Sequence, residues 1–483
     1  MEPLFQLAFM DVSHFYSLLK SDFPHEATPK QDIALQLLAQ FALNSSKDQV
    51  FLLKGYAGTG KTTLIGTLVK NLWKAQLSFT LLAPTGRAAK VITNYSKRQA
   101  LTIHKKIYKP RNEGEGKVSF QLEKNKHRNV LFIVDEASMI PDINQTDKLF
   151  ENGSLLDDLM QYVYSGHNCK LLLIGDTAQL PPIKLQISPA LDAQTLENHY
   201  NKEVTSLELD EVVRQSKQSG ILYNATEIRR CLDEGFYEDF KFDERSFPEV
   251  VRPIDGQELM DAISDSYSDL GKEETAIIVR SNKRANLYNQ NIRERILFNE
   301  NELTAGDFLM VVKNNYFWVK PHSEAGFIAN GDIIEVLEIF GFKELYGFRF
   351  AEVRIQMVDY PSMKPFETVL LLDTLTSETP SLSYEESNKL YQGVRADYAH
   401  EKSKYKQFMG VKKNKFFNAL QVKFSYAITC HKSQGGQWNT VFVEQPYLPN
   451  GMDKDYLRWL YTAVTRAKEK LVLIGFKDEF FVD

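Results

Sequence analysis

A glycine-rich turn between an apolar strand and a helical segment constrains the fold of this chain more than any other feature. The residues VFLLK (50–54) lead directly into GYAGTGKT (55–62), which fits the pattern G-x4-G-K-[ST]. The glycines allow backbone N–H groups to surround phosphate oxygens at the start of a helix, and the lysine adds a positive charge. The pattern therefore predicts a parallel sheet and a site for a nucleoside triphosphate.

Apolar runs of strand length alternate with helical patterns in both halves of the chain. Helical patterns at 283–298 and 455–468 separate the later runs. Near-continuous apolar strands that alternate with helices are typical of parallel sheets covered on both faces, so we predict α/β domains. The apolar runs cover 50–54, 79–84, 130–136 and 170–176 in the first part, and 275–281, 440–444 and 470–475 in the second.

Two segments interrupt this alternation. Residues 105–128 are polar and contain the turn-rich NEGEG (112–116), which predicts a short inserted β-hairpin. Residues 336–424 contain long β-type runs followed by a Lys-rich helical stretch, which predicts a small inserted β module. We therefore expect a first domain over 1–215 that carries the hairpin and a second domain over 216–483 that carries the module.

Acidic and amide side chains follow two predicted strands of the first domain. Asp135 and Glu136 lie in VDEAS (134–138), and Gln179 lies in GDTAQLPP (175–182). Asp135 and the hydroxyl group of Thr62 are suitable ligands for Mg²⁺, and Glu136 can accept a proton from an attacking water. Gln179 is placed to contact a terminal phosphate. These motifs predict that the chain hydrolyses a nucleoside triphosphate with Mg²⁺.

The order of motifs along the chain resembles superfamily 1 helicases, specifically their 5′-to-3′ RecD-like and Dda-like branch. The resemblance covers most of residues 28–483. It implies two RecA-like P-loop lobes with ATP bound between them, a hairpin that acts as a strand-separation pin, and an SH3-like β module. Beside the three motifs above, the matching segments are LAPTGRAAK (82–90), LTIHK (101–105), ELDEVVRQ (208–215), TCHKSQG (429–435) and YTAVTRAKEKLVLIG (461–475).

The resemblance also assigns the residues of the ATP site. Arg466 in VTRA would act as an arginine finger, with Arg214 as its companion; an ion pair with Glu208 or Glu211 is the alternative for Arg214. Gln31 in TPKQ would contact the adenine. The expected catalytic residues are Lys61, Glu136, Gln179, Arg214 and Arg466. The expected nucleotide-binding residues are Gln31, Gly55, Ala57, Gly58, Thr59, Gly60, Lys61, Thr62, Thr63, Asp135, Glu136, Gln179, Arg214, Gln437 and Arg466, with Mg²⁺ on Thr62 and Asp135.

Contacts with single-stranded DNA and with duplex junctions are implied by the same resemblance. Hydroxyl groups and backbone amides suit phosphate and sugar contacts, which position a strand without reading its sequence. Tyr108 and Phe120 of the hairpin either press on the splitting base pair or pack the hairpin onto its lobe. The expected nucleic-acid contacts are Pro84, Thr85, Gly86, Thr102, His104, Tyr108, Thr429, His431, Lys432 and Ser433.

The distribution of charge is compatible with a polyanionic partner, although the net charge of the whole chain is −5. Residues 97–128 carry a local net charge of +7 and residues 401–415 one of +5, with a solvated surface as the plain alternative. The three cysteines are far apart and no apolar run approaches the ~20 residues of a membrane span. We expect a cytoplasmic, monomeric motor without a membrane partner, and single-strand-binding or recombination proteins as candidate partners.

Several alternatives stay open. An RNA or RNA–DNA helicase is one, because backbone and stacking contacts do not test the 2′-hydroxyl group. An ATP-driven DNA-binding adaptor that does not unwind is another, and the motifs do not choose between repair, recombination and replication. Gln437 departs from a family pattern that often has an acidic residue there. The adjacent Cys430 and His431 suggest a thiol nucleophile, but nothing near them in sequence orients the imidazole, so we expect Cys430 to pack.

Overall fold

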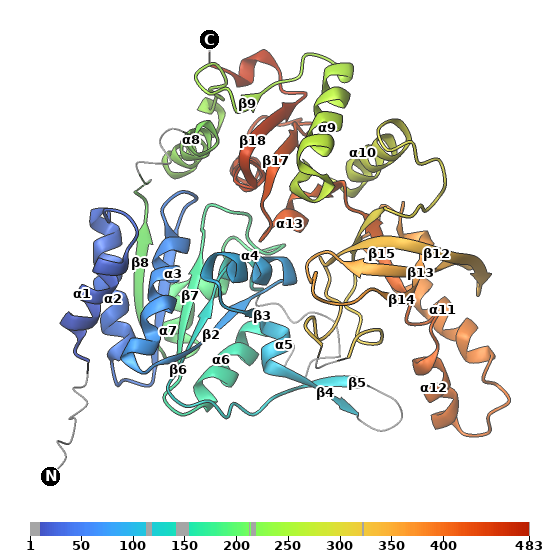
Figure 1. Cartoon of the computed structure of the whole chain (residues 1–483), viewed down its shortest axis with the longest axis horizontal. Coiled ribbons are helices and arrows are strands. Elements are labelled where there is room, and N and C mark those ends of the chain that lie inside the picture. Colours follow the sequence, from blue (N-terminus) through green and yellow to red (C-terminus); the bar gives the residue numbers. More distant parts are fainter. Residues whose placement is uncertain are drawn as a thin grey trace. The chain divides into compact units, whose positions relative to one another are not determined.

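The computed structural model describes residues 10–112, 118–141, 154–211, 213, 219–320 and 323–482, except for the side chains of 110–112 and 118–120. The chain forms two compact units (Figure 1). Unit 1 comprises Met1–Pro84, Ala89–Tyr108 and Leu122–Gln218, and unit 2 comprises Thr85–Ala88, Lys109–Gln121 and Ser219–Asp483. The domain boundary expected at 215/216 stays a prediction.

Unit 1 is built on a parallel six-stranded sheet with the order β3-β2-β6-β7-β1-β8. Every residue of β6 and β7 is buried, as expected for strands covered on both faces. Since β7 lies between β6 and β1, the carboxyl ends of the three strands that carry the predicted motifs are neighbours. The strands are β1 (Gln49–Gly55), β2 (Ser78–Ala83), β3 (Ala100–Thr102), β6 (Val130–Val134), β7 (Lys170–Gly175) and β8 (Glu203–Leu209).

Several helices of unit 1 begin at residues whose side chains cap them. The Thr28 hydroxyl group accepts from the Gln31 amide and the Gln31 side chain accepts from the Thr28 amide, so a capping box starts α2, with Pro29 at its first position. The Ser154 hydroxyl group caps α6 by accepting from the Asp157 amide. The helices are α1 (Val12–Asp22), α2 (Pro29–Leu43), α3 (Lys61–Asn71), α4 (Gly86–Ser96), α5 (Ile103–Ile107), α6 (Leu155–Ser165) and α7 (Ala193–Asn198), where α4 begins within the short segment assigned to unit 2.

Unit 2 contains a second parallel sheet, of five strands in the order β16-β10-β17-β18-β9. Two parallel sheets with interleaved helices confirm the predicted α/β fold of two RecA-like lobes. The strands are β9 (Val250–Val251), β10 (Thr275–Val279), β16 (Ala427–Thr429), β17 (Trp438–Glu444) and β18 (Ala467–Ile474). The helices are α8 (Gly220–Glu234), α9 (Gly256–Leu270), α10 (Asn282–Arg295), α13 (Cys430–Ser433) and α14 (Lys454–Val464).

A closed five-stranded barrel interrupts the second sheet and corresponds to the predicted β module. Its strands pair antiparallel except β14 and β15, and Val336, Val353 and Val422 belong to its core. The barrel begins earlier than the predicted residue 336, because β11 pairs with both β12 and β15. The strands are β11 (Phe308–Val311), β12 (Ile333–Leu345), β13 (Phe348–Met357), β14 (Phe366–Leu371) and β15 (Leu420–Phe424), and the attached helices are α11 (Tyr384–Ala396) and α12 (Lys404–Lys413).

The predicted hairpin is present as the two-stranded sheet of β4 (Tyr108–Asn112) and β5 (Val118–Leu122). Residues 113–117, which include most of the predicted turn NEGEG (112–116), and the side chain of Phe120 lie outside the described part of the structure. Among the described residues, no helix has the length and apolar character needed to cross a membrane.

Candidate nucleotide and nucleic-acid sites

The glycine-rich turn between β1 and α3 has the backbone conformation expected of a phosphate-binding loop. Gly58 and Gly60 have φ angles of +75° and +83°, in the left-handed region that favours glycine. A Cβ atom at Gly60 would also lie 2.5 Å from the Gln31 amide nitrogen. Val213, which follows β8, donates its backbone N–H to the Gly58 carbonyl oxygen at 3.1 Å. The loop is therefore shaped by its glycines and held from two neighbouring segments of unit 1.

Lys61 lies inside this loop. Its ammonium group donates to the carbonyl oxygens of Gly55 and Tyr56, at 2.6 and 2.8 Å. The hydroxyl group of Thr59 donates to the Tyr56 carbonyl oxygen at 2.8 Å, and its side chain is buried. A positive charge at the N-terminus of α3, beside the loop amides, favours phosphate oxygens.

Gln31 supports the loop from α2. Its side-chain amide nitrogen donates to the Thr59 carbonyl oxygen at 2.9 Å, while its side-chain oxygen accepts from the Thr28 amide at 3.0 Å. The side chain is 2% exposed. The contact with adenine expected for Gln31 stays a prediction, and the structure adds a direct role in holding the glycine-rich turn.

Asp135 and Glu136 follow β6 directly. The Asp135 carboxylate accepts from the Glu136 amide at 2.8 Å and from the hydroxyl group of Tyr95, on α4, at 3.0 Å. Burial raises the pKa of Asp135, against the Glu136 amide and the nearby Lys61 charge. Glu136 has a φ angle of +56°, a strained conformation for a residue other than glycine. Sequence reasoning missed Tyr95, which lies 40 residues before Asp135 and outside any motif.

Gln179 lies in the turn after β7. Its side chain is 7% exposed, and its side-chain oxygen has no hydrogen-bond partner among the described residues. A buried acceptor without a partner costs free energy unless a ligand or water satisfies it. The neighbouring Asp176 already has a partner within the turn, because its carboxylate accepts from the Ala178 amide at 2.9 Å. Gln179 is thus the side chain of this turn that a ligand would satisfy.

The residues at this edge of the sheet fit Mg²⁺ and a triphosphate. Thr62 is exposed in the first turn of α3, Thr63 is half-buried beside it, and Asp135 supplies a carboxylate. The unpartnered Gln179 oxygen and the loop amides complete a set of donors and acceptors that matches a phosphate chain with a hard cation. The structure brings together all the expected nucleotide-binding residues of β1, β6 and β7.

Arg466 of unit 2 is placed differently from the expected arginine finger. Its side chain is 3% exposed and donates to the carbonyl oxygens of Thr462 and Gly436, at 2.9 and 3.2 Å, and to the Thr465 hydroxyl group at 3.1 Å. A contact with a γ-phosphate requires that these hydrogen bonds be exchanged, so the finger role stays a prediction. Gln437 is exposed, and Arg214 lies outside the described residues.

The segment TCHKSQG forms the end of β16, the short helix α13 and the loop after it. Cys430 is 1% exposed, its thiol donates to the Trp459 carbonyl oxygen at 3.4 Å, and burial raises its pKa to about 12. These values exclude a ready thiolate and agree with a packing role. Ser433 is expected to contact the strand, but it is fully buried and its hydroxyl group donates to the Cys430 carbonyl oxygen at 2.8 Å.

Two of the expected strand contacts in unit 1 are also buried. The Thr102 hydroxyl group caps α5 by accepting from the Lys105 amide at 3.2 Å, and Thr102 is 6% exposed. Tyr108 is 8% exposed, and its hydroxyl group donates to the Asp158 carboxylate on α6 at 2.6 Å. The hydrogen bond to Asp158 attaches Tyr108, the first residue of β4, to α6, so of the two roles left open for Tyr108 the structure supports packing.

The other expected contacts remain accessible in part. His431 is exposed, whereas Thr429, Lys432 and His104 are half-buried, as are Pro84 and Thr85 beside the buried Gly86. Burial lowers the pKa of Lys432 to about 8 and that of His104 to about 4. Sequence reasoning missed Lys423 on β15, whose pKa is lowered to about 8 by burial and by Lys432.

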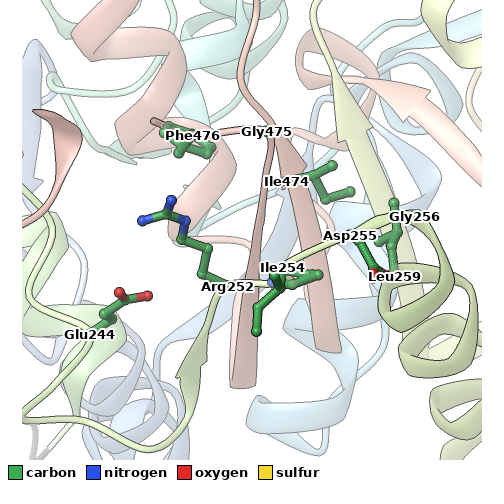
Figure 2. A pocket seen from close by; sticks show the side chains of 10 residues that line it. Glu244, Arg252, Ile254, Asp255, Gly256, Leu259, Ile474, Gly475 and Phe476 are labelled. Atoms are coloured by element: carbon green, nitrogen blue, oxygen red, sulfur yellow. The ribbon is translucent and has the colours of Figure 1, made fainter. Parts of the chain in front are cut away.

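A cavity of about 570 Å³ lies in unit 2 at the end of β18, beside the start of α9 (Figure 2). Ile254 and Ile474 supply apolar surface, and the two charged groups nearest α9 are already paired. Arg252 forms an ion pair with Asp478 at 2.5 Å, and the Asp255 carboxylate accepts from the Glu258 amide at 2.9 Å. Arg252 and Asp255 therefore have partners within the protein, and Glu244 adds a further carboxylate to the lining.

The fold and the site define a P-loop protein with two RecA-like units. A family described as AAA domain matches residues 34–231, and one described as UvrD-like helicase C-terminal domain matches residues 424–474. Together with the relatives found by sequence, RecD2 and Dda, these matches confirm the predicted resemblance: the chain is similar to superfamily 1 helicases of the RecD-like and Dda-like branch.

The relatives differ in length from this chain. It is 25% identical to an uncharacterized protein of Methanocaldococcus jannaschii, over 91% of this chain but only 38% of that protein. The ATP-dependent DNA helicase Dda of Enterobacteria phage T4 is 24% identical, over 88% of this chain and 94% of that protein. The ATP-dependent RecD2 DNA helicase of Deinococcus radiodurans is 29% identical, over 37% of this chain and 21% of that protein. A solved structure of Pif1 helicase from Bacteroides, in complex with ADP-AlF3 and single-stranded DNA, has a TM-score of 0.45 at 14% identity, over 95% of this chain and 94% of that one.

Proposed function

We propose that the chain is an ATP-dependent DNA helicase that translocates on single-stranded DNA in the 5′-to-3′ direction. The observation that carries the proposal is the convergence of the glycine-rich turn, Asp135–Glu136 and Gln179 at the carboxyl ends of three neighbouring strands. The direction is taken from the resemblance to the RecD-like and Dda-like branch. The full-length resemblance to Dda, which is named an ATP-dependent DNA helicase, supports DNA as the track.

Different residues of unit 1 have different roles in hydrolysis. The loop amides and Lys61 bind and orient the phosphates, and Glu136 accepts a proton from the attacking water. Thr62 and Asp135 would hold Mg²⁺, which supplies charge neutralisation on the phosphates when bound. The Gln179 side-chain oxygen, which has no partner among the described residues, can accept a hydrogen bond from the attacking water beside a terminal phosphate, so its free energy depends on the nucleotide state.

In unit 2, the candidate link between nucleotide and strand is the loop after α13. Arg466 donates to the Gly436 carbonyl oxygen, and His431 and Lys432 lie five and four residues before Gly436. If Arg466 moved on nucleotide binding, its hydrogen bond to Gly436 would change. The backbone next to His431 and Lys432, which are expected to contact the strand, would then move as well. Half-buried Lys432 suits a phosphate contact because partial desolvation strengthens its charge interaction.

Unwinding assays with tailed duplexes test this function. Duplexes with only a 5′ tail or only a 3′ tail, made in DNA and in RNA, are incubated with ATP and Mg²⁺. We expect unwinding of the 5′-tailed DNA duplex, and none by a Lys61→Ala variant, which loses its phosphate contact. Unwinding from the 3′ tail alone would refute the direction, and preference for RNA would refute DNA as the track. Strand-stimulated hydrolysis without any unwinding would identify the chain as an adaptor.

A further inference from the structure

Tyr95 contacts the predicted Mg²⁺ ligand although it belongs to none of the motifs. Its hydroxyl group donates to Oδ2 of Asp135 at 3.0 Å, while Oδ1 of Asp135 accepts from the Glu136 amide at 2.8 Å. Each carboxylate oxygen therefore has one donor, and the two bonds together fix the rotation of the carboxylate. Burial, Asp135 and Glu136 all raise the pKa of Tyr95, so its hydroxyl group keeps the proton that it donates.

We infer that Tyr95 is a positioning residue: it orients Asp135 for the Mg²⁺–nucleotide complex and makes that orientation depend on a strand bound at Pro84–Gly86. The inference rests on the proposed function. A donor that holds a metal-ligating carboxylate leaves the remaining lone pairs directed at the metal, and loss of such a donor weakens metal binding by about 10- to 100-fold.

The path from the strand contact to Asp135 is a single helix. Helix α4 begins at Gly86, and the Thr85 hydroxyl group accepts from the Ala88 amide at 3.2 Å at its start. Tyr95 is the penultimate residue of α4, about 13 Å from Gly86 along the axis at the usual rise per residue. Ala88, Ala89 and Ile92 are buried, so the first two turns of α4 are packed, and the hydrogen-bonded helix connects them to Tyr95. A displacement at its first turn therefore reaches the Tyr95 hydroxyl group.

A Tyr95→Phe variant removes the hydroxyl group and keeps the ring. The measurement is the Mg²⁺ concentration that gives half-maximal binding of a fluorescent ADP analogue to the full chain, with and without oligothymidylate. We expect oligothymidylate to lower this concentration for the unsubstituted chain. In Tyr95→Phe we expect a requirement for Mg²⁺ that is about tenfold higher, and no effect of the oligonucleotide. Binding of the analogue without Mg²⁺ should stay unchanged, because the glycine-rich turn is intact.

Tyr164→Phe is the matched control. The Tyr164 hydroxyl group donates to the Gln49 carbonyl oxygen at 2.7 Å, in the same unit and at the opposite end of β1 from the glycine-rich turn. Its loss should lower the melting temperature as Tyr95→Phe does and leave the Mg²⁺ dependence unchanged. An unchanged Mg²⁺ requirement in Tyr95→Phe, or an effect of the oligonucleotide that survives in it, overturns the inference alone. If the unsubstituted chain shows no Mg²⁺-dependent binding, the proposed function fails and the inference fails with it.

Discussion

Arg466 and Gly436 are joined by a hydrogen bond of 3.2 Å from the guanidinium group to the carbonyl oxygen. The backbone of Arg466 makes a second link, because its carbonyl oxygen accepts from the Trp438 amide at 3.0 Å. Gly435, which comes directly before these two bonds, has a φ angle of +72°, in the left-handed region that favours glycine. Hydrogen bonds therefore connect VTRA directly to the loop that follows TCHKSQG, although the two motifs are far apart in sequence.

Replacement of Arg466 by alanine tests two roles of this residue: the expected contact with the γ-phosphate and the hydrogen bond that holds the Gly436 carbonyl oxygen. We expect turnover of ATP to fall roughly 10³-fold, the scale of an arginine finger, while nucleotide affinity stays near normal. The free energy of unfolding should also fall by about 1–3 kcal/mol, because the buried Gly436 carbonyl oxygen loses its donor. Steady-state kinetics, nucleotide titration and urea unfolding measure the three quantities.

Thr465→Ala is the control for this packing effect. It removes the hydroxyl group that accepts from Arg466 and donates to the Tyr461 carbonyl oxygen at 2.8 Å, but leaves the guanidinium group in place. It should lower stability by about 1 kcal/mol and change turnover by only a few-fold. Equal losses of turnover in the two variants would mean that Arg466 acts only by holding the loop.

Gln31→Ala distinguishes base recognition from support of the glycine-rich turn. Because the Gln31 amide donates to the Thr59 carbonyl oxygen, we expect the Kd to rise about five- to tenfold both for ATP and for inorganic tripolyphosphate, which has no base. Calorimetric titration measures both. Gln49→Ala, which removes a half-buried side chain at the start of β1, at the far end of the strand from the glycine-rich turn, should change neither. A loss confined to ATP would instead assign Gln31 to the adenine.

The sequence patterns predict the central strands and the glycine-rich turn because both are local. β6 and β7 are apolar at nearly every residue, and a buried parallel strand requires that composition. Edge strand β8 was missed since its sequence EVTSLEL alternates polar residues on a half-exposed strand, and β3 and β16 are too short to give a pattern.

The side-chain partners could not be predicted because they depend on contacts across the fold. Tyr108 forms a hydrogen bond with Asp158, which lies 50 residues later in the sequence, and Tyr95 forms one with Asp135, which lies 40 residues later. The burial of Arg466 depends in the same way on Gly436, 30 residues before it. A motif specifies which residue types a site needs, whereas the protonation and orientation of those residues follow from neighbours that no motif contains.

The stability of unit 1 should depend on pH through His104. Burial lowers its pKa to about 4, from 6.5 for a free imidazole. Between these values the unfolded chain binds a proton that the folded chain does not, so the free energy of unfolding falls as the pH is lowered through this window. The loss from pH 6.5 to pH 5 should be about 1–2 kcal/mol smaller in His104→Gln than in the unsubstituted chain. Urea unfolding at several pH values measures this, and His25→Gln, which changes an exposed imidazole, should keep the original slope.

Cys430 should be dispensable for catalysis and resistant to alkylation. Its thiol is buried against the Trp459 carbonyl oxygen and its pKa is raised to about 12, so almost no thiolate exists near neutral pH. In a Cys169→Ala, Cys231→Ala background, iodoacetamide at pH 8 should label Cys430 only after denaturation, as followed by mass spectrometry. Cys430→Ala should keep its turnover and lose about 1 kcal/mol of stability. Rapid labelling of the folded chain, or loss of turnover in a well-folded Cys430→Ala variant, would restore the thiol as a reactive group.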